Sequence, residues 1–402
     1  MLFGKWSEVV ARCGGRAALW WVDRDEKVTF AQLDARANDC VQEGDIWRAD
    51  GDSPDFLATL IAAWKHGKPV ILMEAGHHNV RPIREEIPEG TVLIKQTCGA
   101  SGMERSLFFT GPQVLAEGMR NLEGLGLHAD RPGLAAISLA HSYGFGCLAL
   151  PLLLGGVPLH LVPTPLPMFI EKALEKNDKV FLPGVPAIWK MWWKTGVTGH
   201  SAIELALSAG SLLSGELENA IYVESGLKVH NFYGTTETGA IALDRTSVPR
   251  EEAGEIGAVL DGVKLVIVED VVMVKSDSRA EGADALLGPD EFVSEFYRTT
   301  DLGRLEDGKL ILTGSQAGAI NVAGRKISPG KLERILMEHP GVISVKVTKI
   351  ASLDIERFEE IHAKVTVLQE IGKRELREGL SGRFENWEMP RHWEIIPPSR
   401  SR

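Results

Sequence analysis

Two hydrophobic patterns alternate along most of the chain. Short apolar runs such as Thr91–Lys95 and Leu205–Ala209 are bounded by glycine or small polar residues, which is typical of buried strands. Between these runs lie segments with apolar residues three or four positions apart, such as Gln113–Asn121 and Ala187–Lys194, which are typical of amphipathic helices. This alternation, with glycines at the strand ends, predicts a large doubly wound α/β domain.

The pattern changes in the last part of the chain. Strands are predicted between Val263 and Lys275, and the Asp-Gly pair within Leu305–Leu310 predicts a hairpin, so a β-rich subdomain follows the α/β body. A strand at Ile320–Ala323 then leads into a helix with Ser328 as its predicted N-cap, and further strands and a helix complete a small α/β unit.

The distribution of charge separates these parts. Residues 315–402 carry a net charge of +3, whereas the rest of the chain carries −14. Together with the small, flexible residues that begin at Gly314, this change of sign predicts two domains, residues 1–314 and residues 315–402.

Composition excludes several classes of protein. The 402 residues, 44% apolar and 25% charged, are those of an ordinary globular protein, and a net charge of −11 argues against general nucleic-acid binding. The four cysteines form no CxxC pair, so a reducing cytoplasm is expected rather than a disulfide framework or a metal cluster.

The start of the chain lacks an apolar signal core. The most apolar run, Gly146–Pro163, is interrupted by glycines and prolines, which predicts a buried helix leading into a strand rather than a membrane span.

The stretch Asn231–Gly239, which reads NFYGTTETG, carries the most distinctive chemistry. The alternating residues Leu227–His230 before it predict a strand that enters the sheet. Tyr233 offers a flat ring for stacking, Gly234 permits a sharp turn, and Glu237 is a hard oxygen ligand for Mg²⁺. Because open α/β sheets bind ligands where such strands end, a nucleotide site is predicted here; a polar β-turn is the alternative.

Two further polar segments fit the same chemistry. Gln96–Arg105 combines two glycines with small hydroxyl residues, so its backbone N–H groups can fold over phosphates while Arg105 meets their charge. Asp301, within Tyr297–Gly303, is suited to accept two hydrogen bonds from a ribose diol. The alternatives are a flexible surface turn for the first segment and a capping aspartate for the second.

A third polar segment follows the predicted strand Leu134–Leu139. Ala140–Gly146 places a histidine, a serine and two aromatic side chains at a strand end, where they can line a small-molecule pocket. His141 and Ser142 have no acidic residue nearby, and the chain contains no G-x-S-x-G motif, so a hydrolase site is disfavoured.

In this order, the segments resemble the ANL superfamily of adenylate-forming enzymes, which includes acyl- and aryl-CoA synthetases, adenylation domains and luciferases. The similarity runs from about Thr29 to the C-terminus. The YGTTE stretch resembles the family's signature, Thr97–Arg105 its phosphate loop and Tyr297–Asp301 its ribose motif, while Ile320–Leu336 resembles the start of its mobile C-terminal lid.

The resemblance implies a role for each matching residue. Tyr233 would stack on adenine together with the stretch from Ser208 to Ser211, Thr236 would contact the α-phosphate, and Gly324 would lie on the path of a pantetheine thiol. The implied nucleotide- and cofactor-binding residues are Thr97, Gly99, Ser101, Gly102, Ala209, Gly210, Ser211, Asn231, Tyr233, Gly234, Thr235, Asp301 and Gly324. Those implied for the acid are His141, Tyr143, Gly144 and Gly239, and those for catalysis are Arg105, Thr236, Glu237 and Lys326, with Glu237 also as the Mg²⁺ ligand.

The implied reaction has two steps. A carboxylate attacks the α-phosphorus of ATP and expels pyrophosphate, with Mg²⁺ and cationic side chains offsetting the repulsion between anions. The acyl-adenylate then passes its acyl group to the thiol of CoA or of a carrier protein's 4'-phosphopantetheine, after a movement of the lid. His141–Gly146 and Pro183–Pro186 carry no acidic residue to pair with an amino group, which favours a fatty or aromatic acid of lipid or secondary metabolism over an amino acid. A non-catalytic nucleotide- or acyl-binding homologue is the alternative.

The chain departs from the family pattern at several positions. Glu104-Arg105 stands in place of Pro-Lys, Thr300 in place of a glycine, and Ser315 and Ala317 in place of an arginine and a hinge acid. The C-terminal Gly-Lys motif is absent. Three expectations follow and stay open at this point: a cation such as Arg400, Arg402 or Lys326 substitutes, adenylation is slow, or the chain is truncated.

Overall fold

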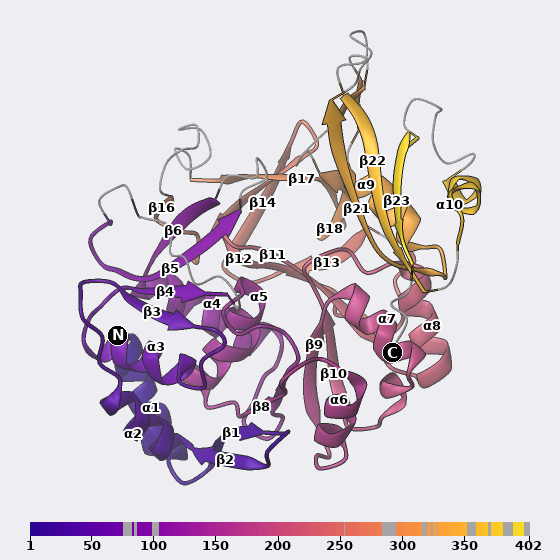
Figure 1. Cartoon of the computed structure of the whole chain (residues 1–402). Helices are drawn as coiled ribbons and strands as arrows, with labels where there is room; N and C mark the ends of the chain where they lie inside the picture. Colours follow the sequence, from indigo (N-terminus) through magenta and orange to yellow (C-terminus); the bar gives the residue numbers. More distant parts are fainter. Residues whose placement is uncertain are drawn as a thin grey trace.

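The computed structural model of the protein describes residues 1–74, 83, 87–98, 104–252, 254–283, 295–315, 320–322, 325–327, 329–351, 359–368, 371–380 and 389–397. Within these residues, four sheets and the helices packed on them form a large α/β body and a smaller C-terminal part (Figure 1). No helix in the described ranges is long and apolar enough to cross a membrane.

The largest sheet has 13 strands among the described residues and changes character along its width. Its first half is parallel, as predicted for a doubly wound body, with β2 (Glu26–Thr29) antiparallel at the edge. The parallel strands in spatial order are β1 (Ala17–Trp21), β8 (Leu159–Leu161), β7 (Gly133–Ala135), β9 (Val180–Gly184), β10 (Ile203–Ser208) and β11 (Val229–Thr235).

The second half of this sheet is antiparallel and forms the predicted β-rich part. It continues from β11 through β12 (Gly239–Leu243), β13 (Glu255–Val259), β18 (Lys309–Ser315), β17 (Tyr297–Glu306), β15 (Val271–Ser276) and β14 (Val263–Val268). β11 is parallel to β10 and antiparallel to β12, so the strand direction switches at β11. Such a switch is where ligands bind in open α/β sheets.

Helices connect the parallel strands and bury the tryptophans between them. These connections are α6 (Pro167–Leu174), α7 (Pro186–Lys194), the 3₁₀ turn η3 (Val197–Gly199) and α8 (Gly215–Ser225). Trp189 and Trp192 of α7 are fully buried and pack in the core. Ser214 caps α8 by accepting a hydrogen bond from the Leu217 N–H at 3.2 Å.

A second sheet lies on the N-terminal side, with the order β16 (Gly282–Ala283), β6 (Glu104–Thr110), β5 (Thr91–Cys98), β4 (Val70–Met73) and β3 (Trp47–Asp50). The helices of this region are α1 (Leu2–Cys13), α2 (Phe30–Asp39), α3 (Phe56–Lys65) and α4 (Gly111–Gly124). β5 and β6 correct one prediction. The described residues of the predicted loop Gln96–Arg105, which are 96–98 and 104–105, are strand: Gln96 pairs with Ser106 and Cys98 with Glu104 in an antiparallel ladder.

The apolar run in the middle of the chain also differs from the prediction. Strand β7 ends at Ala135 instead of Leu139, because the chain bends there and the Ala136 N–H donates to the Leu134 carbonyl at 2.9 Å. A single turn, α5 (Ser142–Gly144), then leads into two π-helical segments, η1 (Phe145–Ala149) and η2 (Pro151–Gly155), and not into one regular α-helix. Gly156, with a φ of +76°, ends this buried segment before β8.

The C-terminal unit has its own hydrophobic core. We use this name for β19 (Ile320–Val322), β20 (Arg325–Ile327), α9 (Pro329–Met337), β21 (Val342–Ala351), β22 (Glu359–Val367), α10 (Lys373–Leu380) and β23 (His392–Ile396). The apolar face of α9, made of Leu332, Ile335 and Leu336, is buried in that core.

Two lysines of α7 hold the C-terminal unit against the body. Lys190 Nζ donates to the carbonyls of Val342 and, at 3.3 Å, His339, and Lys194 Nζ donates to the Pro340 carbonyl at 3.2 Å. Burial, with a smaller contribution from Lys194, lowers the pKa of Lys190 to about 8. The charge of Lys190 is therefore used at the contact between the two parts of the structure.

Candidate active site

The end of β11 is shaped for a close turn. A Cβ on Gly234 would lie 2.6 Å from the Gly239 carbonyl oxygen, so the two strands approach too closely for any other residue. Gly239 itself has a φ of +72°, and a Cβ there would meet Ser278 Oγ at 2.8 Å. The two predicted glycines are thus required by the turn that carries Thr235, Thr236 and Glu237.

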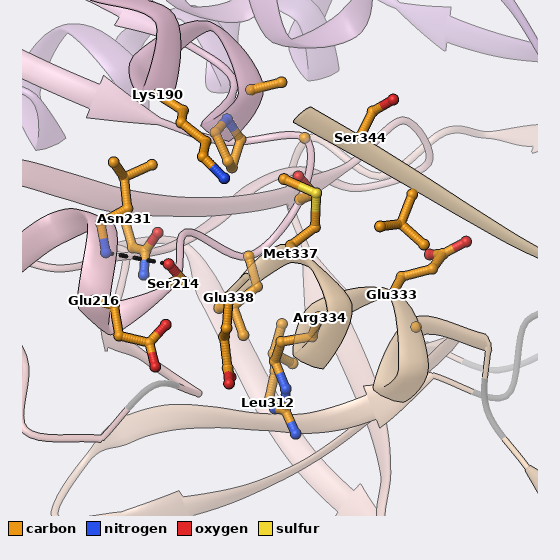
Figure 2. Close-up of a pocket in the computed structure, with 18 of the residues that line it drawn as sticks. Lys190, Ser214, Glu216, Asn231, Leu312, Glu333, Arg334, Met337, Glu338 and Ser344 are labelled. Carbon is orange, nitrogen blue, oxygen red and sulfur yellow. Dashed lines mark hydrogen bonds between the residues drawn. The ribbon is translucent and has the colours of Figure 1, made fainter. Parts of the chain in front are cut away.

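A cavity of about 690 Å³ opens beside this strand end, between the body and the C-terminal unit. Six residues predicted to bind the nucleotide line it: Gly210, Ser211, Asn231, Tyr233, Gly234 and Asp301. The C-terminal unit contributes α9 and the start of β21 as the opposite wall, and Figure 2 shows the side chains of Met337, Glu338 and Arg334 there. The structure therefore brings together residues that are up to 91 positions apart in the predicted motifs, from Gly210 to Asp301.

Tyr233 and Asp301 are bound to each other inside this cavity. The Tyr233 hydroxyl donates to Asp301 Oδ2 at 2.6 Å. Burial raises the pKa of the tyrosine well above its ordinary value, so the phenol stays protonated and remains a donor. Burial also raises the pKa of Asp301, more than the hydrogen bonds from Tyr233 and Ser315 lower it.

Replacing Asp301 by asparagine is expected to raise thermal stability at neutral pH. Because the folded-state pKa of Asp301 is raised, the native chain binds a proton more readily than the unfolded chain, and its stability falls as the pH rises through that window. Asparagine carries no charge, so it removes this loss of stability at neutral pH. Its amide oxygen can still accept a hydrogen bond from Tyr233. The melting temperature of the variant should exceed that of the wild type by more at pH 7 than at pH 4. An equal difference at both pH values, or a less stable variant at pH 7, would contradict this account.

Glu237 does not line the cavity, and its carboxylate forms an ion pair with a neighbouring arginine. Arg105 Nη2 forms an ion pair with Glu237 Oε1 and also donates to the Tyr297 hydroxyl at 3.1 Å. Both partners are nearly buried, with side-chain exposures of 6% for Arg105 and 10% for Glu237. Arg105 thus belongs to strand β6 and pairs with a carboxylate, which corrects its predicted place in an open loop.

The chain offers few ligands for a metal at this point. Among the described residues, no cluster of three or more histidine, cysteine or acidic side chains could hold a metal ion. Glu237 can contribute Oε2, since its other oxygen faces Arg105. One carboxylate oxygen fits Mg²⁺ when phosphate oxygens and water supply the other ligands, which is the usual way this ion binds nucleotides.

Three of the residues predicted for the acid, His141, Tyr143 and Gly144, lie together at and just before the turn α5. Tyr143 donates to the Leu207 carbonyl at 3.1 Å, and its ring stacks on Phe232 with centroids 6.1 Å apart. His141 Nδ1 accepts from the Tyr143 N–H at 3.3 Å. A Cβ on Gly144 would lie 2.0 Å from the Ser138 carbonyl oxygen, so that position must be glycine. These residues do not line the cavity.

A buried ion pair lies behind this group and was not predicted. Lys95 Nζ lies 3.1 Å from Glu117 Oε2, and both side chains are less than 5% exposed. Lys95 also lies over the Phe109 ring, 4.7 Å from its centroid. A Cβ on Gly239 would contact Glu117 Cδ at 3.3 Å. Periodicity alone places Glu117 on helix α4 but cannot tell which strand residue it meets.

Several predicted residues can be placed only in part. Thr236 lies in the turn between β11 and β12, and Ala209 is buried just after β10. Thr235 Oγ1 lies 3.0 Å from Thr238 Oγ1. Gly99, Ser101, Gly102, Gly324, Arg400 and Arg402 lie outside the described residues, as do the side chains of Thr97 and Lys326.

Comparison with known proteins agrees with this arrangement. The family model described as "AMP-binding enzyme" matches residues 113–282. The 2-succinylbenzoate–CoA ligase of Bacillus mycoides (strain KBAB4) is 28% identical over 289 residues, which are 67% of this chain and 59% of the relative. The 2-succinylbenzoate–CoA ligase of Escherichia coli (strain K12) is 24% identical over 310 residues, 75% of this chain and 64% of the relative. The chain thus spans less than two thirds of the length of these relatives.

Solved structures share the whole fold. o-Succinylbenzoate CoA synthetase (MenE) from Bacillus subtilis, in complex with the acyl-adenylate intermediate OSB-AMP, has a TM-score of 0.82 at 18% identity and covers 98% of this chain and 94% of its own. ATP-bound MatB from Rhodopseudomonas palustris has a TM-score of 0.77 at 17% identity, covering 98% and 95%. Residues 113–282 thus match the AMP-binding enzyme family, and the described chain shares the fold of these solved structures.

Proposed function

We propose that the protein activates a carboxylic acid with ATP, releases pyrophosphate, and transfers the acyl group from the adenylate to the thiol of CoA. The observation that carries this proposal is the cavity in which Tyr233, Asp301, Asn231 and the Gly210–Ser211 turn meet at the switch point of the sheet. Relatives named as CoA ligases support the reaction, and a neighbour solved with an acyl-adenylate supports the intermediate.

The residues divide into roles along the cavity. We assign the adenine to Tyr233 and to the Gly210–Ser211 turn, and the ribose diol to Asp301, whose Oδ2 already accepts a hydrogen bond from Tyr233. Thr235 and Thr236 offer hydroxyl donors for the phosphates at the next turn. Arg105 holds a positive charge at the same turn and can stabilise the charge that develops during attack.

Mg²⁺ belongs to this proposal, and Glu237 would hold it through Oε2. When bound, it would supply positive charge to the phosphate oxygens. The role of the chain is to hold Glu237 in a nearly buried position, where its ion pair with Arg105 orients the carboxylate.

The acid and the acyl acceptor are assigned more broadly. We place the acid beside His141, Tyr143, Gly144 and Gly239, and an aromatic acid is supported by relatives and neighbours named for 2-succinylbenzoate and anthranilate. We propose residues 315–402 as a lid that moves between the two steps; its separate core and its docking through Lys190 and Lys194 support such a movement. Transfer to a carrier protein's phosphopantetheine is the alternative to CoA.

Pyrophosphate exchange tests this function directly. The purified chain, ATP, Mg²⁺ and labelled pyrophosphate should exchange label only when the correct acid is added, with aromatic and fatty acids tried before amino acids. Replacing Asp301 by alanine should raise the KM for ATP and leave the KM for the acid unchanged, because only the ribose contact is lost. ATP binding without exchange for any acid would instead identify a non-catalytic nucleotide-binding homologue.

A further inference from the structure

The cavity needs a cation that the residues discussed so far do not supply. Four acidic residues line it, namely Glu216, Asp301, Glu333 and Glu338, so an anionic phosphate chain entering it meets repulsion. Two basic residues line it within the described part of the chain, Lys190 and Arg334. Because an anion in a partly buried site needs an opposite charge, one of these two must face the ligand.

Lys190 is already engaged. Its ammonium donates to two carbonyls of the C-terminal unit, those of His339 and Val342. Arg105, the other cation near the strand end, is engaged by Glu237 and Tyr297. Neither can turn to a ligand without breaking a contact that holds the two parts of the structure, or the turn, in place.

Arg334 is differently situated. It projects from α9, one helical turn before Glu338, and Figure 2 shows its guanidinium reaching past the helix toward Leu312 of β18. Among the described residues no hydrogen bond or ion pair engages it. A half-buried guanidinium with an uncommitted charge on a cavity wall is suited to a bidentate anionic partner.

The neighbouring strand explains why a charge is needed at this place. β18 ends at Ser315, which is paired with Asp301 across the sheet and lines the same cavity. Position 315 is where the resemblance led us to expect an arginine. α9 packs beside β18, so Arg334 brings a guanidinium to the same cavity from a different element.

We propose that Arg334 is a nucleotide-binding residue that pairs with the phosphate chain of ATP from the C-terminal unit and replaces the cation that position 315 lacks. This inference rests on the proposed function for the identity of the ligand. It adds a contact that joins the nucleotide to the C-terminal unit, so binding of the phosphates and docking of that unit stabilise each other.

Equilibrium binding of ATP and of adenosine, measured by calorimetry, tests the inference without requiring turnover. Arg334→Ala should weaken ATP binding by about 10- to 100-fold, the usual loss for one charge-assisted pair, and change adenosine binding by less than about twofold. Adding Ser315→Arg to Arg334→Ala should recover ATP binding, because it returns a guanidinium to the same cavity. Arg374→Ala is the matched control, since Arg374 is 92% exposed on α10 of the same unit.

The possible results separate the two proposals. Unchanged ATP binding in Arg334→Ala, an equal loss for adenosine, or no recovery with Ser315→Arg would overturn the role of Arg334, whether or not exchange occurs. ATP binding that depends on Arg334 in a chain without exchange would support the inference and refute only the proposed activity. A wild-type chain that binds no ATP would refute both.

Discussion

Replacing Glu237 by glutamine should reduce pyrophosphate exchange by at least about 100-fold. The carboxylate is the one charged ligand that the turn after β11 offers to a metal, and the loss of a single electrostatic contact in such a site has effects of this size. Glutamine keeps the shape and can still accept a hydrogen bond from Arg105, so ATP binding should weaken far less than the exchange rate. The measurement is the exchange rate at saturating ATP, together with the affinity for ATP.

A second variant separates this catalytic role from a structural one. Glu237→Gln removes the ion pair between Glu237 and the nearly buried Arg105, which can cost a few kcal/mol of folding free energy. Adding Arg105→Met removes the charge of Arg105 and should recover stability, whereas exchange should stay low. Exchange that returns with stability would mean that Glu237 acts only by supporting the fold. Glu306→Gln, at an exposed ion pair on β17, is the control and should leave both quantities unchanged.

Replacing Glu218 by alanine should lower the free energy of unfolding by about 3–5 kcal/mol, the usual cost of breaking a buried ion pair. Glu218 is fully buried and pairs with two cations, Lys228 and, through Oε2 at 2.6 Å, Arg250. Its removal leaves Lys228 paired with Asp244 and takes from Arg250 its ion pair with Glu218. Chemical denaturation measures the effect, and a midpoint near the wild-type value would contradict the assigned role.

The same variant should also weaken nucleotide binding at a distance. Arg250 donates to the carbonyls of Leu213 and Glu255, each at 2.8 Å, and with its amide oxygen facing Arg250, Asn231 accepts from Nη2 at 2.9 Å. Asn231 lines the cavity, so a guanidinium released from Glu218 should disturb that wall. Glu8→Gln, on an exposed pair within α1, is the matched control and should change stability by less than about 1 kcal/mol.

Much of the local structure could be predicted because neighbouring residues determine it. Thr29 and Gln32, three residues apart, form the two reciprocal hydrogen bonds of a capping box at the start of α2, a pattern that can be read from the sequence. Asp307 and Gly308 adopt φ values of 49° and 76°, as a two-residue hairpin turn requires, and they connect β17 to β18.

Predictions failed where the pattern was ambiguous or the partner was distant. Gln96–Cys98 has the composition of a loop, but its backbone pairs with β6, and a strand is formed when such a partner is present. The apolar run at Phe145–Gly155 predicts burial correctly, whereas its π-helical geometry depends on packing against α1 and α4.

By itself the sequence determined the strand that ends in the YGTTE turn, the glycines this turn requires, and the order of the motifs along the chain. Backbone conformation and turn chemistry act over a few residues, so these features can be read locally. Only the tertiary structure decided which charged side chains are already paired with another group of the protein. Arg105 meets Glu237 across 132 positions, Lys190 meets the Val342 carbonyl across 152, and Arg334 lines the same cavity as Asp301. Electrostatic pairing depends on distance in space and on burial, and neither is written in the spacing of residues along the chain.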